Sequence, residues 1–433
     1  MKKKILALGL CLAADAAMAQ TADGSSVQVY GAFDIGVGHS QYSLSQDSNF
    51  PVGVNPVITH YAANSVTGMF NGGLGGSNIG FKGMEDLGGG LKATFKLEAG
   101  FNSFDGALNN GVASVANNPS AKQSTANGDS SLAGQLFNRE ATVGLSSSDW
   151  GSVAFGRNNT LGYDALIAYD VMGGSYEFSP FGYFGSYGAG GFTEDYRLDN
   201  SIKYRLKMAN GFNVGALYKI GGQAGASSAQ AELQVTAGYE NGPFSVQGLY
   251  SKTNDAISAS NAAAAGAVAL TVADNTAYML GAAYKGSGWK VSGGYERLLY
   301  QNPSNPAADV LITSVFGVPV TGTPNVTAYT IEKRLSVYFA GVSFDVSPAV
   351  TLSAAAYDVR QNDYSGGLCA ASDTASSKCS GSNSFYSLLA QYKFSKRTQV
   401  YGGYMYSKVE GGYSAGFVND NDSFFGVGMR HTF

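Results

Sequence analysis

The stretch Leu91 to Phe101, LKATFKLEAGF, alternates in character at every residue. Its odd-numbered positions hold Leu, Ala and Phe, and its even-numbered positions from 92 to 98 hold Lys, Thr, Lys and Glu. Successive side chains of a strand point to opposite faces, whereas a helix would scatter both sets around its axis. The stretch therefore predicts a strand with one apolar face and one polar face.

The same alternation recurs along the rest of the chain. A strand that crosses a membrane within a barrel needs about 9 to 11 residues, with apolar side chains toward lipid and polar or small ones toward the lumen. Sixteen segments fit this pattern: 27–38, 77–83, 91–101, 136–145, 150–157, 199–206, 211–220, 231–240, 243–252, 275–285, 288–299, 334–345, 349–360, 384–394, 397–407 and 422–433. An even number of antiparallel strands leaves both ends of the chain on one side, which in barrels of this type is the periplasm.

The connections between these segments alternate in length. The short ones carry Gly, Asn, Asp, Ser or Pro, residues that favour tight turns; they are 84–90, 146–149, 207–210, 241–242, 286–287, 346–348 and 395–396. The long ones are 39–76, 102–135, 158–198, 221–230, 253–274, 300–333, 361–383 and 408–421. Seven short and eight long connections are what sixteen antiparallel strands require.

The composition supports an all-β chain. The 433 residues include 59 Gly, 27 Tyr and 24 Phe, and only 13% are charged, which favours extended backbone over helices with charged faces. A soluble β-sandwich would also contain many strands, but it gives no reason for the alternating connection lengths. The sequence therefore predicts an all-β fold, a transmembrane antiparallel β-barrel of sixteen strands with short periplasmic turns and long extracellular loops.

The N-terminus has the features of a secretory signal peptide. MKKK is basic, Ile5 to Leu12 is a short apolar run, and Ala17 to Ala19 is a small-residue cleavage pattern. We expect residues 1–19 to be removed and residues 20–433 to form one domain. Removal lowers the basic residues from 27 to 24 and the acidic residues from 31 to 30, so the net charge becomes about −6. This mild acidity argues against a nucleic-acid partner.

The C-terminal sequence GMRHTF ends on an aromatic residue, Phe433. In a closed barrel the last strand pairs with the first, so DSFFGVGMRHTF (422–433) is expected beside VQVYGAFDIGVG (27–38). Phe433 has outward parity, and we expect it in the aromatic girdle at the periplasmic interface.

Several segments resemble the general trimeric porins of the Gram-negative outer membrane. They are VQVYGAFDIGVG, SNIGFKGMEDLGGGLKATFKLEAGF, LFNREATVGLSSSDWGSVAFGR, RLDNSIKYR and GMRHTF. The resemblance implies a homotrimer in outer-membrane lipids that passes small hydrophilic solutes and ions by diffusion. It also implies that the outer-membrane assembly machinery reads Phe433, and that the loop at about 158–198 folds into the lumen as a constriction.

The charges at such a constriction select the solute. Within the loop, Asp164, Asp170 and Glu177 are the candidate acidic residues. Basic residues of lumen parity are candidates for the pore wall, namely Lys82, Lys92, Lys96, Lys203, Arg205 and Arg430. Opposed acids and bases create a transverse field that favours polar solutes. The sequence does not decide between anions and cations.

Two arginines and an aromatic cluster leave alternatives open. Arg139 and Arg157 occupy positions that resemble the family's pore arginines, but alternation gives them lipid-facing parity. Either a bulge redirects them or they lie beyond the lipid band. The cluster Ser175 to Gly188 either stacks on a solute or packs the loop against the barrel, and we favour packing.

The remaining residues with reactive side chains predict no catalysis. Cys369 and Cys379 lie in a Ser-rich segment, where we expect a disulfide outside the cytoplasm, with two free thiols as the alternative. The three histidines form no catalytic or metal-binding pattern, so neither an enzyme nor a metal or other cofactor is expected. A substrate-selective channel, and an adhesin or receptor on a barrel scaffold, are the alternatives to general diffusion.

Overall fold

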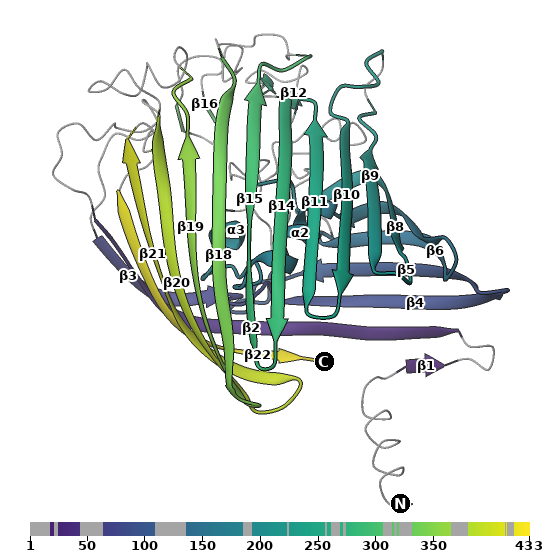
Figure 1. Cartoon of the computed structure of the whole chain (residues 1–433), viewed down its shortest axis with the longest axis horizontal. Coiled ribbons are helices and arrows are strands. Elements are labelled where there is room, and N and C mark those ends of the chain that lie inside the picture. The colour runs from purple at the N-terminus through teal and green to yellow at the C-terminus, as the bar shows by residue number, and fades with distance from the viewer. Residues whose placement is uncertain are drawn as a thin grey trace, which may run out of the picture.

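Sixteen antiparallel strand positions close into a barrel in the computed structural model (Figure 1). The structure describes residues 18–20, 25–43, 64–108, 136–184, 193–222, 225–255, 258–260, 269–271, 274–305, 314–315, 318–319, 331–364, 380–411, 413 and 420–433. The wall consists of β2 (Ser26–Ser43), β3 (Asn64–Asn71), β4 (Asn78–Gly88), β5 (Leu91–Gly100), β6 (Glu140–Ser147), β7 (Gly151–Asn159), β8 (Arg197–Lys207), β9 (Phe212–Lys219), β10 (Glu232–Asn241), β11 (Phe244–Thr253), β14 (Asp274–Gly286), β15 (Trp289–Gln301), β18 (Lys333–Ser347), β19 (Val350–Gln361), β20 (Gly381–Lys393), β21 (Thr398–Gly411) and β22 (Asn421–Thr432). The predicted fold is confirmed.

The first and last strands close the barrel. β2 pairs with β22 from Ala32 opposite Thr432 to Ser43 opposite Asn421. Phe433 then exchanges two backbone hydrogen bonds with Gly31, of 3.0 and 3.1 Å. The chain end lies beside a short turn, because the Thr432 N–H donates to Arg397 O at 2.8 Å. No strand edge is left open at this point, which explains why the chain can end on an alternating apolar strand.

The second of the sixteen wall positions is shared by two strands, β3 and β4. Both β3 and β4 pair with β2, and the six residues Gly72–Ser77 between them leave the wall. The prediction of 39–76 as one connection is therefore wrong, since β2 runs on to Ser43 and β3 lies within the predicted loop. Val66 and Met69 have opposite parity and are both exposed, so β3 lacks the alternation that reveals the other strands. Likewise, β4 runs through most of the predicted turn 84–90.

The connection between β7 and β8 carries two helices, α2 (Leu161–Tyr169) and α3 (Pro180–Phe184), which lie inside the ring of strands (Figure 1). Thr160 caps α2, because its Oγ1 accepts from the Tyr163 N–H at 3.0 Å. The buried face of α2, with Leu161, Leu166 and Tyr169, packs against β9, β10, β11, β14 and β15. Among the described residues, no helix is long and apolar enough to cross a membrane.

The aromatic cluster after α2 packs the loop against the opposite wall. Phe178 and Phe181 are fully buried. The Phe181 ring lies edge-on to Phe339 of β18 and Tyr357 of β19, with centroids 5.1 and 5.5 Å apart, and Phe178 lies edge-on to Tyr401 of β21. These contacts support the packing interpretation for this part of Ser175 to Gly188, of which 185–188 lie outside the described residues.

The outer face of the barrel is apolar. Large hydrophobic side chains are exposed on this face and alternate along each strand with side chains that face the lumen. Examples of the exposed side chains are Phe81, Phe155, Leu280 and Leu388. Near the short turns Tyr284 stacks on Trp289 with centroids 5.4 Å apart, as in an aromatic girdle. Three short pairings lie outside the wall: β1 (Met18–Gln20) with β2, β12 (Ser258–Ser260) with β13 (Ala269–Thr271), and β16 (Ser314–Val315) with β17 (Val318–Pro319). The signal peptide remains a prediction, because residues 1–17 lie outside the described part of the chain.

Candidate functional site

The segment Gly72–Ser77, here called the inward turn, is held in the lumen by Asp34 of β2. The backbone N–H groups of Gly73, Leu74 and Gly75 each donate to the Asp34 carboxylate at 3.2 Å. Successive backbone N–H groups of this kind form a concavity that binds an anion. The sequence offered a signal that we missed: the GGLGGS run is too rich in glycine to continue a strand.

Arg430 completes this arrangement from β22. Its Nη1 lies 3.2 Å from the Asp34 carboxylate and donates to Gly75 O at 3.1 Å. A Cβ on Gly75 would lie 3.0 Å from Arg430 Nη1, and one on Gly76 would lie 3.3 Å from Arg139 Nη1. The two glycines therefore allow both guanidinium groups to approach the inward turn closely.

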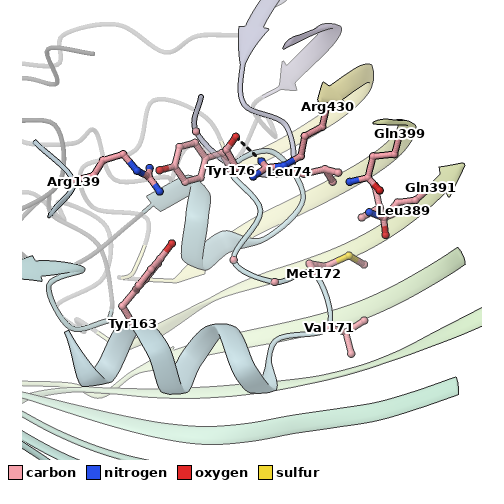
Figure 2. A pocket seen from close by; sticks show the side chains of 14 residues that line it. Leu74, Arg139, Tyr163, Val171, Met172, Tyr176, Leu389, Gln391, Gln399 and Arg430 are labelled. Carbon is pink, nitrogen blue, oxygen red and sulfur yellow. Dashed lines mark hydrogen bonds between the residues drawn. The ribbon is translucent and has the colours of Figure 1, made fainter. Parts of the chain in front are cut away.

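A cavity of about 400 Å³ separates the inward turn from the loop that carries α2 and from the inner wall of β20 to β22. Figure 2 shows Tyr176 between Arg139 and Arg430, with Tyr163 reaching toward them from α2. The lining residues are Leu74, Gly75, Gly76, Arg139, Tyr163, Val171, Met172, Gly173, Gly174, Tyr176, Leu389, Gln391, Gln399 and Arg430. The charged members of this described lining are two arginines, and none is a carboxylate.

Arg139 and Lys96 neutralise the carboxylates beside the cavity. The Arg139 Nε donates to Glu98, and Lys96 Nζ lies 3.4 Å from Glu98 Oε2 and also pairs with Glu140. The Tyr30 hydroxyl donates to Glu98 at 2.7 Å. Two cations and two anions balance in this network, and Lys82 lies on the same wall with its Nζ 5.0 Å from the centroid of the Tyr30 ring.

The structure brings Asp164 together with two of the predicted wall residues. Asp164 Oδ2 lies 2.6 Å from Lys203 Nζ and also accepts from Arg205 Nη2. Lys203 further donates to Asn159 O at 2.7 Å. One carboxylate of α2 is therefore shared by two cations of β8, which leaves an excess of one positive charge.

Arg197 is a lumen residue that the sequence analysis missed. Its side chain is fully buried, its guanidinium lies 5.5 Å from the centroid of the Tyr163 ring, and within the described part of the chain none of its nitrogens has a hydrogen-bond partner. The predicted connection 158–198 includes Arg197, whereas β8 begins at this residue. Parity with Lys203 and Arg205 could not have found it, because the register of β8 shifts between Leu198 and Ser201.

Irregular backbone explains the orientation of the other two arginines. The pairing of β7 with β8 shifts between Gly156 and Asn158, and Gly156 has φ +124°, so a bulge breaks the alternation at Arg157. Arg157 is buried, donates to Asn138 O at 2.8 Å and pairs with Asp199 at 2.7 Å. Arg139 precedes β6, so its parity does not apply and its side chain reaches the cavity.

Two of the predicted acidic residues lie off the cavity surface. Asp170 is buried and accepts from the hydroxyls of Tyr357 and Ser179 at 2.6 and 2.7 Å, so it attaches the loop to β19. Glu177 joins the loop to the inward turn through its N–H, which donates to Gly73 O at 3.3 Å. Burial, with the nearby Asp422 and Asp34, raises the pKa of Glu177 to about 7.

The remaining predicted site residues do not lie at the cavity or lie outside the described residues. Lys92 is the second residue of β5 and pairs with Asp86, beside the turn between β4 and β5 and away from the inward turn. Cys369 and Cys379 lie outside the described residues, so their disulfide stays a prediction. Within the described ranges, no cluster of three or more His, Cys, Asp or Glu side chains is placed to hold a metal ion.

Comparison with known proteins identifies the family. The family described as Gram-negative porin matches residues 6–412. The chain belongs to the Gram-negative porin family. An outer membrane porin protein of Bordetella pertussis is 29% identical over the full length of both chains. Outer membrane porin protein 32 of Delftia acidovorans is 30% identical over 57% of this chain and 58% of its own.

Solved porin structures share the fold. The anion-selective porin from Comamonas acidovorans superposes with a TM-score of 0.62 at 24% identity, covering 94% of this chain and all of that one. OmpT of Vibrio cholerae superposes with a TM-score of 0.58 at 15% identity, covering 97% of this chain and all of that one. This porin therefore lies in the Gram-negative outer membrane and forms a passive channel.

Proposed function

We propose that this porin narrows between the inward turn and the loop of α2, and that it prefers anions there. The observation that carries the proposal is the cavity lining, which contains Arg139 and Arg430 but no carboxylate among the described residues. Fixed charges of one sign in a narrow passage raise the local concentration of the opposite ion. Two carboxylates beside the cavity, Glu98 and Asp34, are each engaged by an arginine.

The charges around the cavity also favour anions. Asp164 is outnumbered by Lys203 and Arg205, and the buried Arg197 has no counter-ion among the described residues. Small hydrophilic anions are the proposed main solutes, and cations pass less readily. The net charge of the whole chain, −4, does not oppose this proposal, because screening limits surface charges to about 8–10 Å at physiological ionic strength.

The reversal potential across a planar bilayer tests the proposal. We expect the potential in a KCl gradient to have the sign of chloride preference. Replacing both arginines by glutamine should lower the chloride-over-potassium permeability ratio by about threefold or more, since both fixed charges at the constriction are lost. A potassium preference in the unmodified channel would refute anion selection. Stepwise closure in units of three would support the proposed homotrimer.

Phe433 is proposed as the residue by which the assembly machinery recognises the chain. Its side chain is exposed on the outer face while its backbone pairs with Gly31, so the ring remains free for a partner before the barrel closes. Phe433→Ala should therefore reduce the amount of folded porin in the outer membrane more than it reduces the stability of the purified barrel. Equal losses in both measurements would contradict a recognition role.

A further inference from the structure

Three arginines lie on the outer wall of adjacent strands near the extracellular end. Arg297 of β15 pairs with Ser336 of β18, and Ser336 pairs with Arg360 of β19. Arg334 lies two residues before Ser336 on the middle strand. Neighbouring strands are about 4.8 Å apart, so the backbones of Arg297 and Arg360 are about 10 Å apart, within reach of one ligand. Arg297, Arg334 and Arg360 are here called the outer arginine patch.

Ring contacts show that the patch faces away from the lumen. Tyr338 of β18 is 45% exposed, and its ring lies 5.0 Å from the ring of Tyr295 and 5.5 Å from the Arg360 guanidinium. Tyr295 precedes Arg297 by two residues, so both point to the same face. The pairing of β15 with its two neighbours has no register shift that would reverse this face.

The patch lies where lipid head groups are expected. β15 rises from the short turn at Gly286–Trp289, and Arg297 is close to its other end at Gln301. An arginine that faces lipid is costly at the bilayer midplane but costs little at the interface. Tyr295 and Tyr338 lie on the midplane side of the arginines, as tyrosines of an interfacial belt do.

The guanidinium groups are incompletely paired. Within the described part of the chain, Arg297 and Arg334 form no ion pair, and Arg297 Nε is buried without a hydrogen-bond partner. Arg360 pairs with Asp358 at 2.6 Å. The acidic groups that face the patch are Asp358 and Glu332, and Glu332 also accepts from Gln301 at 3.2 Å. Three cations against two anions leave a positive patch with free donors.

We propose that the outer arginine patch binds the phosphate-bearing head group of a lipid of the outer leaflet. Arginine forks form bidentate, charge-assisted hydrogen bonds with phosphate oxygens, and the three side chains converge from three strands on one head group. The exposed Tyr338 and Leu280 beside the patch then contact the acyl chains. This inference does not depend on the ion preference of the lumen, because the patch lies on the opposite side of the wall.

Lipid binding to the purified, detergent-solubilised porin tests the proposal. Native mass spectrometry counts the lipids retained during titration with diphosphoryl lipid A or with a phosphate-free glycolipid of the same acyl length. We expect the unmodified porin to bind the phosphorylated lipid about tenfold more tightly. The triple variant R297Q/R334Q/R360Q should lose about tenfold in affinity for it, and R297Q alone about threefold.

Lys252→Gln is the matched control. Lys252 is an exposed cation near the extracellular end of β11, on the same outer face as Tyr250, whose ring packs on Tyr278. This variant should keep its affinity within about twofold. The variants are folded if their change in electrophoretic mobility on heating and their conductance equal those of the unmodified porin. Where the triple variant does not fold, the single variant decides.

Three results would overturn the proposal. They are equal binding of the two lipids by the unmodified porin, undiminished binding by the arginine variants, and an equal loss in Lys252→Gln. A fourth arm uses 10 mM inorganic phosphate alone. Protection of the unmodified porin from thermal unfolding by this ion, absent in the triple variant, would assign the patch to free phosphate and reject the lipid.

Discussion

The Tyr401 hydroxyl donates a 2.5 Å hydrogen bond to the carboxylate of Asp34, 367 residues away in the sequence. The same hydroxyl accepts from the Gly73 N–H at 3.1 Å, so a residue of β21 holds both the acid and the inward turn that the acid binds. Between them, Asp34 and Tyr401 determine how far Gly72–Ser77 extends into the lumen. The proposed constriction of this porin therefore depends on a wall strand as well as on the loop of α2.

Replacing Asp34 by Ala should release the inward turn. Three backbone N–H groups and Arg430 would lose a buried acceptor, and removing one partner of a buried pair costs about 3–5 kcal/mol. We expect the barrel to unfold at a lower temperature, as measured by the change in its electrophoretic mobility on heating. We also expect a larger or noisier single-channel conductance. Tyr401→Phe, which removes one hydroxyl, should cost only about 1–2 kcal/mol. Unchanged conductance in a folded Asp34→Ala barrel would show that the inward turn does not limit the pore.

A side chain at Gly76 should narrow the cavity. A Cβ there would lie 3.1 Å from the Tyr176 ring and 3.3 Å from Arg139 Nη1, so both side chains must shift. Gly76→Ala should reduce single-channel conductance measurably while the barrel stays folded. Gly68→Ala on β3 is the control, since a Cβ at Gly68 meets no atom within 4 Å. Equal effects of the two variants would argue against a local cause.

Asp164→Asn should strengthen anion preference. The substitution leaves Lys203 and Arg205 without their shared carboxylate, which adds one positive charge to the lumen. We expect the chloride-over-potassium permeability ratio to rise by about twofold. Glu240→Gln removes an equal charge from the exposed pair with Lys207 beside the turn between β8 and β9 and should leave the ratio unchanged. An unchanged or lower ratio in Asp164→Asn would contradict the prediction, and an unchanged ratio would mean that the freed cations lie outside the ion path.

The anion preference should fall as the pH rises through about 7. The pKa of Glu177 is raised to about 7 by burial and by nearby carboxylates, so this group is neutral below that pH and negative above it. Reversal potentials between pH 5.5 and 8.5 measure the effect. Glu177→Gln should show the low-pH selectivity at every pH. A midpoint near 4.5 in the unmodified channel, or persistence of the step in the variant, would assign the change to another group.

The wall was predictable from the sequence because the barrel separates lipid from water at almost every strand. All sixteen predicted segments overlap wall strands, since alternation of one apolar and one polar face is what such a boundary requires. β3 escaped because Val66 and Met69 are exposed on opposite faces. It is followed directly by the glycine-rich run Gly72–Ser77, where hydrophobic residues show no period of two.

The site was predictable only in part, because its geometry depends on contacts between distant segments. Asp164, Lys203 and Arg430 were named from parity and from the resemblance, and the structure places them in the lumen. The burial of Asp170 depends on Tyr357, 187 residues away, and the position of Arg157 depends on a bulge. Neither feature leaves a periodic signal in the chain.

A barrel usually couples the width of its bore to the number and tilt of its strands. The inward turn separates these two properties. Asn71 pairs with Ile35 and Asn78 pairs with Ala32, so six residues lie opposite the two residues Phe33 and Asp34 without a change of strand number or tilt. Insertions or deletions within Gly72–Ser77 can therefore change the bore while the cylinder around it keeps its geometry. Changes in this one short segment can therefore alter the solute size that passes, in evolution or by protein engineering, while the barrel wall stays the same.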